Sequence, residues 1–189
     1  MECSEAGSTC CYHIDGKDRI VSVSDNWLVF AQENEAAESC HPEKIINRSI
    51  WEFIDGIETQ LLYDIVLKNI RRTNKSVRLP FRCDAPGKRR YLELRITPVL
   101  KGTIEFASTI IREELRDSIE MLEFDIPRSD ELVRMCSMCK KVELPGNCWV
   151  EIEAAIVTLK LFEKLKQPQI SHGLCHDCYI LGMAEVDKL

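Results

Sequence analysis

The stretch SVRLPFRC, residues 76–83, alternates apolar and polar side chains with a period of two. Val77, Leu79 and Phe81 share one face, and the arginines share the other. This alternation predicts a β-strand with one buried face. Pro80 has no backbone N–H, so we expect the strand to lie at a sheet edge or to carry a bulge.

Two further strands are predicted downstream of this stretch. The turn-forming segment DAPGKRR, residues 84–90, leads into YLELRITPV, residues 91–99, which alternates again. A second turn at Lys101 and Gly102 precedes the run TIEFASTIIRE, residues 103–113. Short turns between alternating runs favour antiparallel pairing of all three strands.

The upstream half adds a hairpin and a long helix. The runs RIVSV, residues 19–23, and WLVFA, residues 27–31, flank the turn residues SDN and predict two strands. Residues 58–74, ETQLLYDIVLKNIRRTN, place Leu62, Ile65, Val66 and Ile70 on one helical face. The order of elements predicts an α+β domain, in which a five-stranded antiparallel sheet carries helices on one face.

This order resembles that of a PAS domain of bacterial signalling proteins. The resemblance rests on RIVSVSDNWLVFAQEN at the start, on RSIWEFI before the long helix and on the three closing strands, and it covers residues 19–116. It implies a sensing or protein-interaction domain, with a cavity between the sheet and the helices. The side chains that we expect to line it are Trp27, Phe30, Trp51, Phe53, Ile65, Leu79, Phe81, Leu94 and Phe106.

The resemblance does not extend to haem or flavin sensors. The predicted long helix has no histidine to serve as an axial haem ligand, and the short Asn–Cys–Arg motif of flavin sensors is absent from the sequence. We therefore expect neither haem nor flavin, while an unidentified small-molecule ligand stays possible. Each apolar residue named above has the simpler interpretation of an ordinary core residue.

Three further segments complete the predicted organisation. Residues 1–18 are polar and without periodicity, and we interpret them as a flexible N-terminal arm. Residues 117–133 are charged and contain Pro127, which favours a linker. Residues 134–189 hold two CxxC pairs and are predicted to form a small zinc-binding module, with a helix over residues 151–164 between the pairs.

The two cysteine pairs are the main candidate site. Cys136 and Cys139 lie in MCSMCKK, and Cys175 and Cys178 lie in SHGLCHDCY. Paired thiolates suit a tetrahedral zinc ion, because each pair binds one edge of the ion. Iron is the less favoured metal for the same four thiolate ligands. A thiol–disulfide redox site or unliganded thiols are the remaining alternatives.

Nearby residues are possible competitors for the ion. His172, His176 and Cys148 are close in sequence to the pairs, but four cysteines already complete a zinc shell, so we do not predict them as ligands. Covalent haem attachment needs CxxCH, and Lys140 and Tyr179 stand where that histidine would be. We assign no role to the other cysteines, Cys3, Cys10, Cys11, Cys40 and Cys83.

The segment from Cys136 to Tyr179 also resembles a cysteine-rich tail that follows PAS-like or receiver domains in bacterial proteins. The matching positions are Cys136, Cys139, Trp149, Ser171, His172, Gly173, Cys175 and Cys178. The sequence departs from that pattern at His176, where such tails carry proline, and at Cys148, which precedes the tryptophan.

Composition narrows the function classes. The chain has 189 residues, 45% of them hydrophobic and 30% charged, with a net charge of −6, which speaks against a nucleic-acid partner. It shows neither a membrane-spanning run nor a secretory signal, so we expect a cytoplasmic protein without membrane contact. Motifs of serine–histidine–acid, phosphate-loop or HExxH enzymes are absent.

These observations predict a bacterial regulatory protein without catalytic activity. Its partners would be another signalling protein, or a second copy bound through the PAS-like domain. Two alternatives stay open: a redox-responsive zinc–thiolate switch, and a nucleic-acid-binding zinc module with a basic surface that includes Lys140, Lys141, Lys160, Lys164 and Lys166.

Overall fold

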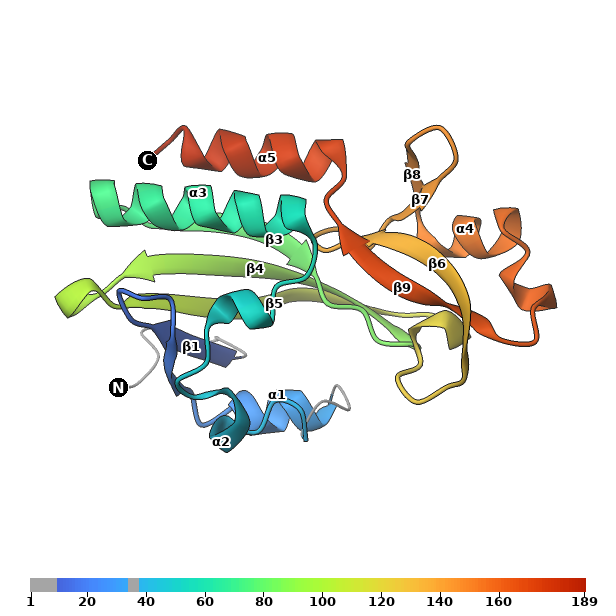
Figure 1. Cartoon of the computed structure of the whole chain (residues 1–189), viewed down its shortest axis with the longest axis horizontal. Helices are drawn as coiled ribbons and strands as arrows, with labels where there is room; N and C mark the ends of the chain where they lie inside the picture. Colours follow the sequence, from blue (N-terminus) through green and yellow to red (C-terminus); the bar gives the residue numbers. More distant parts are fainter. Residues whose placement is uncertain (1–9, 34–37) are drawn as a thin grey trace.

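The computed structural model describes residues 10–33 and 38–189 (Figure 1). The first half of the chain supplies β1 (Cys10–Ile14), β2 (Ile20–Val23), α1 (Trp27–Glu33), α2 (Pro42–Ile45), η1 (Ile50–Glu52), α3 (Ile57–Thr73), β3 (Val77–Arg82) and β4 (Lys88–Pro98). The second half supplies η2 (Leu100–Gly102), β5 (Ile104–Leu115), η3 (Glu120–Leu122), β6 (Arg128–Cys136), β7 (Val142–Leu144), β8 (Cys148–Val150), α4 (Ile152–Thr158), η4 (Leu161–Glu163), β9 (Gln167–Gly173) and α5 (His176–Val186).

The first sheet confirms the predicted fold class. Its five strands are antiparallel and follow the order β2-β1-β5-β4-β3. The alternation in residues 76–83 is seen directly: Leu79 pairs with Leu94, and both side chains are buried. β3 is an edge strand of this sheet, as Pro80 predicted.

Two predictions for the N-terminal segment were wrong. Residues 27–31 form part of helix α1 and not a strand, because a short apolar run does not by itself distinguish a buried strand from a helix. The fifth strand of the sheet is β1, within the segment that we interpreted as a flexible arm. β1 lies between β2 and β5, and its backbone is fixed by both neighbours. Residues 1–9 of the predicted arm lie outside the described residues.

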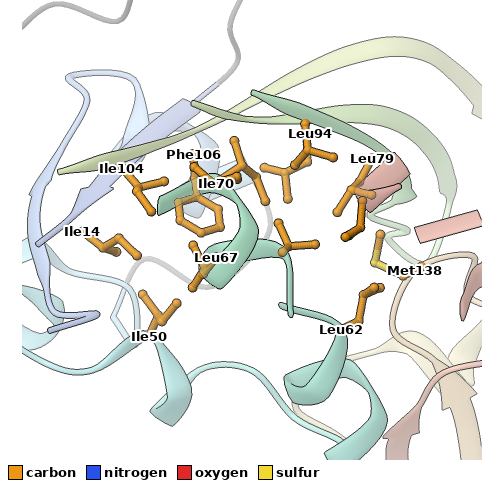
Figure 2. Close-up of a cluster of buried hydrophobic side chains, with 14 of the residues drawn as sticks. Ile14, Ile50, Leu62, Leu67, Ile70, Leu79, Leu94, Ile104, Phe106 and Met138 are labelled. Atoms are coloured by element: carbon orange, nitrogen blue, oxygen red, sulfur yellow. The ribbon is translucent and has the colours of Figure 1, made fainter. Parts of the chain in front are cut away.

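Helix α3 packs on the sheet as its periodicity predicted. Leu62, Val66 and Ile70 are fully buried, whereas Ile65 is only partly buried. The helix starts after Gly56 and ends at Asn74, which takes the left-handed conformation that is common after a helix C-terminus. Figure 2 shows Leu62, Leu67 and Ile70 facing Leu79, Leu94 and Phe106 across the core.

The predicted linker is largely ordered. It contains η3 and the first part of β6, and Ile119 and Met121 are buried in a second hydrophobic core. The Arg128 guanidinium donates hydrogen bonds to the backbone oxygens of Met121, Glu123 and Pro168. These bonds join the segment to the start of β9, so the abundance of charged residues here reflects a hydrogen-bonded connection and not a free linker.

A second sheet lies beside the cysteine pairs, which follow the ends of β6 and β9. Its order is β8-β7-β6-β9, and β6 and β9 run parallel, which requires the crossover through α4 and η4. The helix predicted over residues 151–164 is divided into α4 and η4, with Lys160 in a left-handed conformation between them. Ile152, Ala155 and Leu161 pack this crossover onto the second core.

Helix α5 joins the two halves of the chain. It follows the second cysteine pair, yet it lies beside α3 over the first sheet (Figure 1). Gly182 of α5 leaves the space that Leu62 of α3 occupies, because a Cβ at Gly182 would lie 2.7 Å from a Leu62 methyl carbon. Val186 is buried in the first core. The cysteine-rich segment, predicted as a separate small module, therefore contributes one helix to the layer that covers the first sheet.

Candidate metal centre and cavities

The two cysteine pairs are brought together by the parallel strands β6 and β9. Cys136 is the last residue of β6 and pairs in register with Gly173, the last residue of β9. Cys175 then precedes the first turn of α5, and Cys178 lies within that turn. Because adjacent parallel strands end at the same edge of a sheet, both CxxC segments begin side by side.

The sulfur geometry fits a tetrahedral ion. The Sγ atoms of Cys136, Cys139, Cys175 and Cys178 all lie within 4.8 Å of one another. The Cys139 and Cys175 sulfurs are 3.7 Å apart, and a tetrahedron of thiolates around zinc has edges of about 3.8 Å at the usual Zn–S distance. The Cys175 backbone N–H also points to the Cys136 sulfur at 3.4 Å, as in metal-binding knuckles. These four cysteines could therefore bind a metal ion.

Hydrogen bonds among the thiols of the cluster shift their pKa values. Hydrogen bonds from the Cys139 and Cys178 thiols lower the pKa of Cys136. The pKa of Cys178 is raised because its thiol donates to the sulfurs of Cys136 and Cys139. A bound divalent cation would favour the ionised form of the thiols that coordinate it.

The three competing residues lie outside this cluster. His172 is half-buried on β9, and its Nδ1 is 3.8 Å from an Asp55 carboxylate oxygen. Burial and the positive charge of Lys140 lower the pKa of His172. His176 and Cys148 are exposed, on α5 and β8 respectively. Among the described residues, the metal-binding group consists of the four predicted cysteines alone.

Arg134 explains two other positions of the cysteine-rich pattern. Its guanidinium lies 5.8 Å from the centre of the Trp149 ring and forms ion pairs with Glu143 and Glu58. The guanidinium also fills the space beside Gly173, where any Cβ would collide with it. Glu58 belongs to the first turn of α3, so Arg134 ties the second sheet to the helix that covers the first sheet.

The predicted cavity residues divide into several groups. Trp27 and Phe53 line an apolar cavity of about 200 Å³ between β1, β2 and the short helices. Leu79, Leu94 and Phe106 are buried in the core, as their simpler interpretation expected, and Phe106 stacks on Tyr12 with ring centres 4.7 Å apart. Trp51 and Ile65 pack partly buried against that core, and Phe30 is half-buried.

Sequence reasoning missed most of the cavity wall. Its other members are Tyr12, Ile20, Cys40, Ile45, Ile50 and Ile54. Tyr12 fell in the segment that was interpreted as an arm. The segment CCYHI was a weak signal for β1, because its side chains are buried on both faces and so do not alternate.

Phe53, Ile54 and Phe81 also line a second cavity, of about 320 Å³, which we call the junction pocket. It lies where the N-terminus of α3 meets the loop between Cys136 and Cys139. The residues that complete its wall are Asp55, Thr59, Tyr63, Ser137, Met138, Lys140 and His172. Sequence periodicity does not reveal this pocket, because its wall comes from segments far apart in the chain.

No helix within the described ranges is long and apolar enough to cross a membrane. The chain matches no protein-family profile, and no curated protein sequence matches it significantly.

Two solved structures share part of this arrangement. One is a domain of an HTR-like protein from Haloarcula marismortui, with 18% sequence identity, a TM-score of 0.38 and coverage of 55% of this chain and 97% of that one. The other is the PAS domain of an HTR-like protein from the same organism, with 15% identity, a TM-score of 0.32 and coverage of 54% and 80%.

Proposed function

We propose that this chain is a non-catalytic regulatory protein, in which a PAS-like sensing or interaction domain is completed by a four-cysteine zinc centre. The observation that carries the proposal is the shared core. Cys136 and Cys175 belong to the same buried cluster as Phe106 and Leu62, so the metal ligands and the sensor-like sheet form one packing unit.

Zinc is the preferred ion. Four thiolates from two CxxC segments, with two sulfurs fully buried, are the usual shell of a structural zinc ion. Iron binds the same ligand type and remains the second choice. Such a site needs reduced cysteines, which favours the cytoplasm as the compartment.

The proposed mechanism is a population shift. A small molecule in a cavity, a second copy of the chain or another signalling protein would favour one arrangement of the domain. Because α5 starts at the metal ligands and packs on α3, a structural change at the metal centre would alter the packing on the first sheet, and the reverse. The link to bacterial signalling proteins rests on the sequence resemblance of residues 19–116 to their PAS domains.

Metal analysis of the purified chain tests the central claim. We expect one zinc ion per chain by mass spectrometry of the native protein. Cys178→Ser should lose the ion or bind it far more weakly, whereas Cys148→Ser, which changes an exposed cysteine outside the cluster, should retain it. A native chain without stoichiometric metal would contradict the proposal.

A redox-responsive centre is the second candidate. Cys139 and Cys178 are only half-buried, so an oxidant can reach their sulfurs more easily than those of Cys136 and Cys175. Mild peroxide should then release the ion with the loss of two or more titratable thiols, and reduction should restore both. Retention of the ion under these conditions would contradict the redox-responsive centre and support a purely structural role.

The nucleic-acid alternative gains no support from the lysines that it requires. Lys164 forms an ion pair with Glu131, and Lys140 donates a hydrogen bond to the backbone oxygen of Ser137. Electrophoretic mobility shifts that weaken steeply with salt would revive it.

A further inference from the structure

The junction pocket combines aromatic walls with one end that favours negative charge. The rings of Phe53, Tyr63 and Phe81 and the thioether of Met138 supply its apolar surface. Lys140, in the turn after Cys139, supplies an ammonium group. Helix α3 begins beside the pocket at Ile57, and the N-terminus of a 17-residue helix carries partial positive charge.

Lys140 is held in place by the first cysteine loop. Its backbone has φ of 61°, and its N–H donates to the Cys136 oxygen at 3.0 Å. Its Nζ donates to the Ser137 oxygen at 2.9 Å, which uses one of its three hydrogens. The described residues include no carboxylate in an ion pair with this group. The ammonium therefore keeps donors for a ligand.

Tyr63 offers a second donor. Burial raises the pKa of Tyr63 to about 12, so the phenol stays protonated in neutral solution. Its hydroxyl makes no hydrogen bond within the described part of the chain, although a half-buried phenol normally finds a partner. A ligand oxygen in the pocket would satisfy it.

Two features oppose an anion: the carboxylate of Asp55, and the proposed zinc centre, whose Zn²⁺ ion and four thiolates together carry a charge of −2. Asp55 lines the pocket, but its side chain is 80% exposed, and it lies 3.8 Å from His172 at the rim. Exposed charges are screened by water and salt, whereas the two donors above face a partly enclosed space. The Lys140 ammonium and the Tyr63 hydroxyl are the hydrogen-bond donors that a ligand oxygen could contact.

We propose that the junction pocket binds a small aromatic carboxylate, with the carboxylate at Lys140 and the Tyr63 hydroxyl and the ring between Phe81 and Met138. A volume of about 320 Å³ suits a ligand with one ring. The proposal rests on the proposed metal centre in one respect, since the loop that positions Lys140 is closed by Cys136 and Cys139.

Benzoate is the probe for this site. The full chain, with its metal content measured beforehand, is titrated with benzoate while amide chemical shifts are followed by NMR. We expect saturable shifts at Tyr63, Phe81 and Met138. Benzamide, which has the same shape without the charge, should bind roughly tenfold or more weakly, and so should acetate, which lacks the ring.

Matched variants locate the interaction. Lys140→Gln should weaken benzoate binding roughly tenfold or more, whereas Lys141→Gln, which removes the neighbouring charge outside the pocket, should change it little. Tyr63→Phe should weaken binding severalfold without loss of folding, because that hydroxyl has no described partner. Tyr12→Phe, which removes a phenol from the other cavity, should leave binding unchanged.

Several results would overturn the proposal: no saturable shift in the metal-loaded chain, equal affinity for benzamide and benzoate, or equal effects of the two lysine variants. These results are separable from a failure of the metal centre. A chain that lacks stoichiometric metal but binds benzoate through Lys140 refutes the zinc assignment and supports the pocket.

Discussion

Gly56 is the residue at which the first turn of α3 meets the backbone of β9. It has φ of +86°, and a Cβ at this position would lie 2.7 Å from the His172 carbonyl oxygen. A backbone oxygen cannot move aside as a flexible side chain can. The glycine is therefore required both by its own conformation and by the close approach of another strand.

We expect Gly56→Ala to lower the free energy of unfolding by about 2–4 kcal/mol, through backbone strain plus overpacking. Gly146→Ala is the matched control, because Gly146 also has positive φ, +83°, but has no atom within 4 Å of the added carbon. Urea denaturation of both variants separates the two costs. Equal losses would show that the contact with β9 is unimportant.

Cys10 predicts a pH dependence of stability. Burial raises the pKa of Cys10 to about 12 from its ordinary value of 9.0. Above pH 9 the unfolded chain releases this proton and the folded chain retains it, so stability should fall as pH rises from about 9 towards 12, by up to about 1.4 kcal/mol per pH unit.

The measurement is the free energy of unfolding at pH 8 to 11 in the native chain and in Cys10→Ala. The variant should show a shallower decline, whatever its stability at pH 8. Cys148→Ala, at an exposed cysteine, should follow the native curve. A slope unchanged by Cys10→Ala would contradict the prediction.

At the scale of elements, we expect α5 to depend on the proposed metal centre. Cys175 and Cys178 occupy its N-terminal end, and Gly182 and Val186 bury its other end against the first core. Removal of the ion by a chelator should release the N-terminal turns, since the cysteine loops lose their common ligand. Hydrogen exchange should then rise in α5 by tenfold or more.

Helix α3 is the internal control for this experiment, because Val66, Leu67 and Ile70 in its second half are buried against the first sheet. Its amides should change much less than those of α5. Equally faster hydrogen exchange in both helices would indicate global unfolding. Unchanged protection of α5 after removal of the ion would show that the metal does not stabilise this helix.

The elements also show what local sequence can predict. Strands β3, β4 and β5 and helix α3 have long, regular patterns, and their predicted positions were close to the observed ones. β1 was missed because both faces of CCYHI are largely buried, so polar and apolar side chains do not alternate. α1 was mistaken for a strand because five apolar residues fit either period.

The site was predictable only in part. The spacing of the two CxxC pairs predicted that the four cysteines would come together, and their sulfurs do lie within 4.8 Å of one another. The cavities were not, since their walls join segments from distant parts of the chain. The packing of α5 against Leu62 was also not predictable, because the only local sequence feature that marks it is Gly182 within the helix.

At the scale of the whole molecule, a buried ion-pair network joins the two halves. The Asp84 side chain is 1% exposed and pairs with Arg82 and Arg116, which in turn bind Glu151 and Glu153 at the start of α4. Surface ion pairs contribute little to stability, but removal of one partner from a buried pair leaves an unpaired charge.

Asp84→Ala should therefore lower the free energy of unfolding by about 3 kcal/mol. Asp64→Ala breaks an exposed pair with Lys68 within α3 and should cost about 0.5 kcal/mol or less. Thermal and urea denaturation of both variants test the difference. Similar small losses would mean that the network is dispensable to the junction of the halves.

The packing of α5, which belongs to the cysteine-rich segment, against the first half of the chain has a consequence for protein engineering. A cysteine-rich tail that packed only against itself could be grafted onto any sensor domain as a cassette. Here the tail brings a helix whose Gly182 is shaped to Leu62 of the recipient. In a chimera that joins residues 134–189 to a foreign domain, α5 would have no matching surface to pack on, and its apolar side would be exposed. The foreign domain would also need a residue equivalent to Leu62 opposite Gly182.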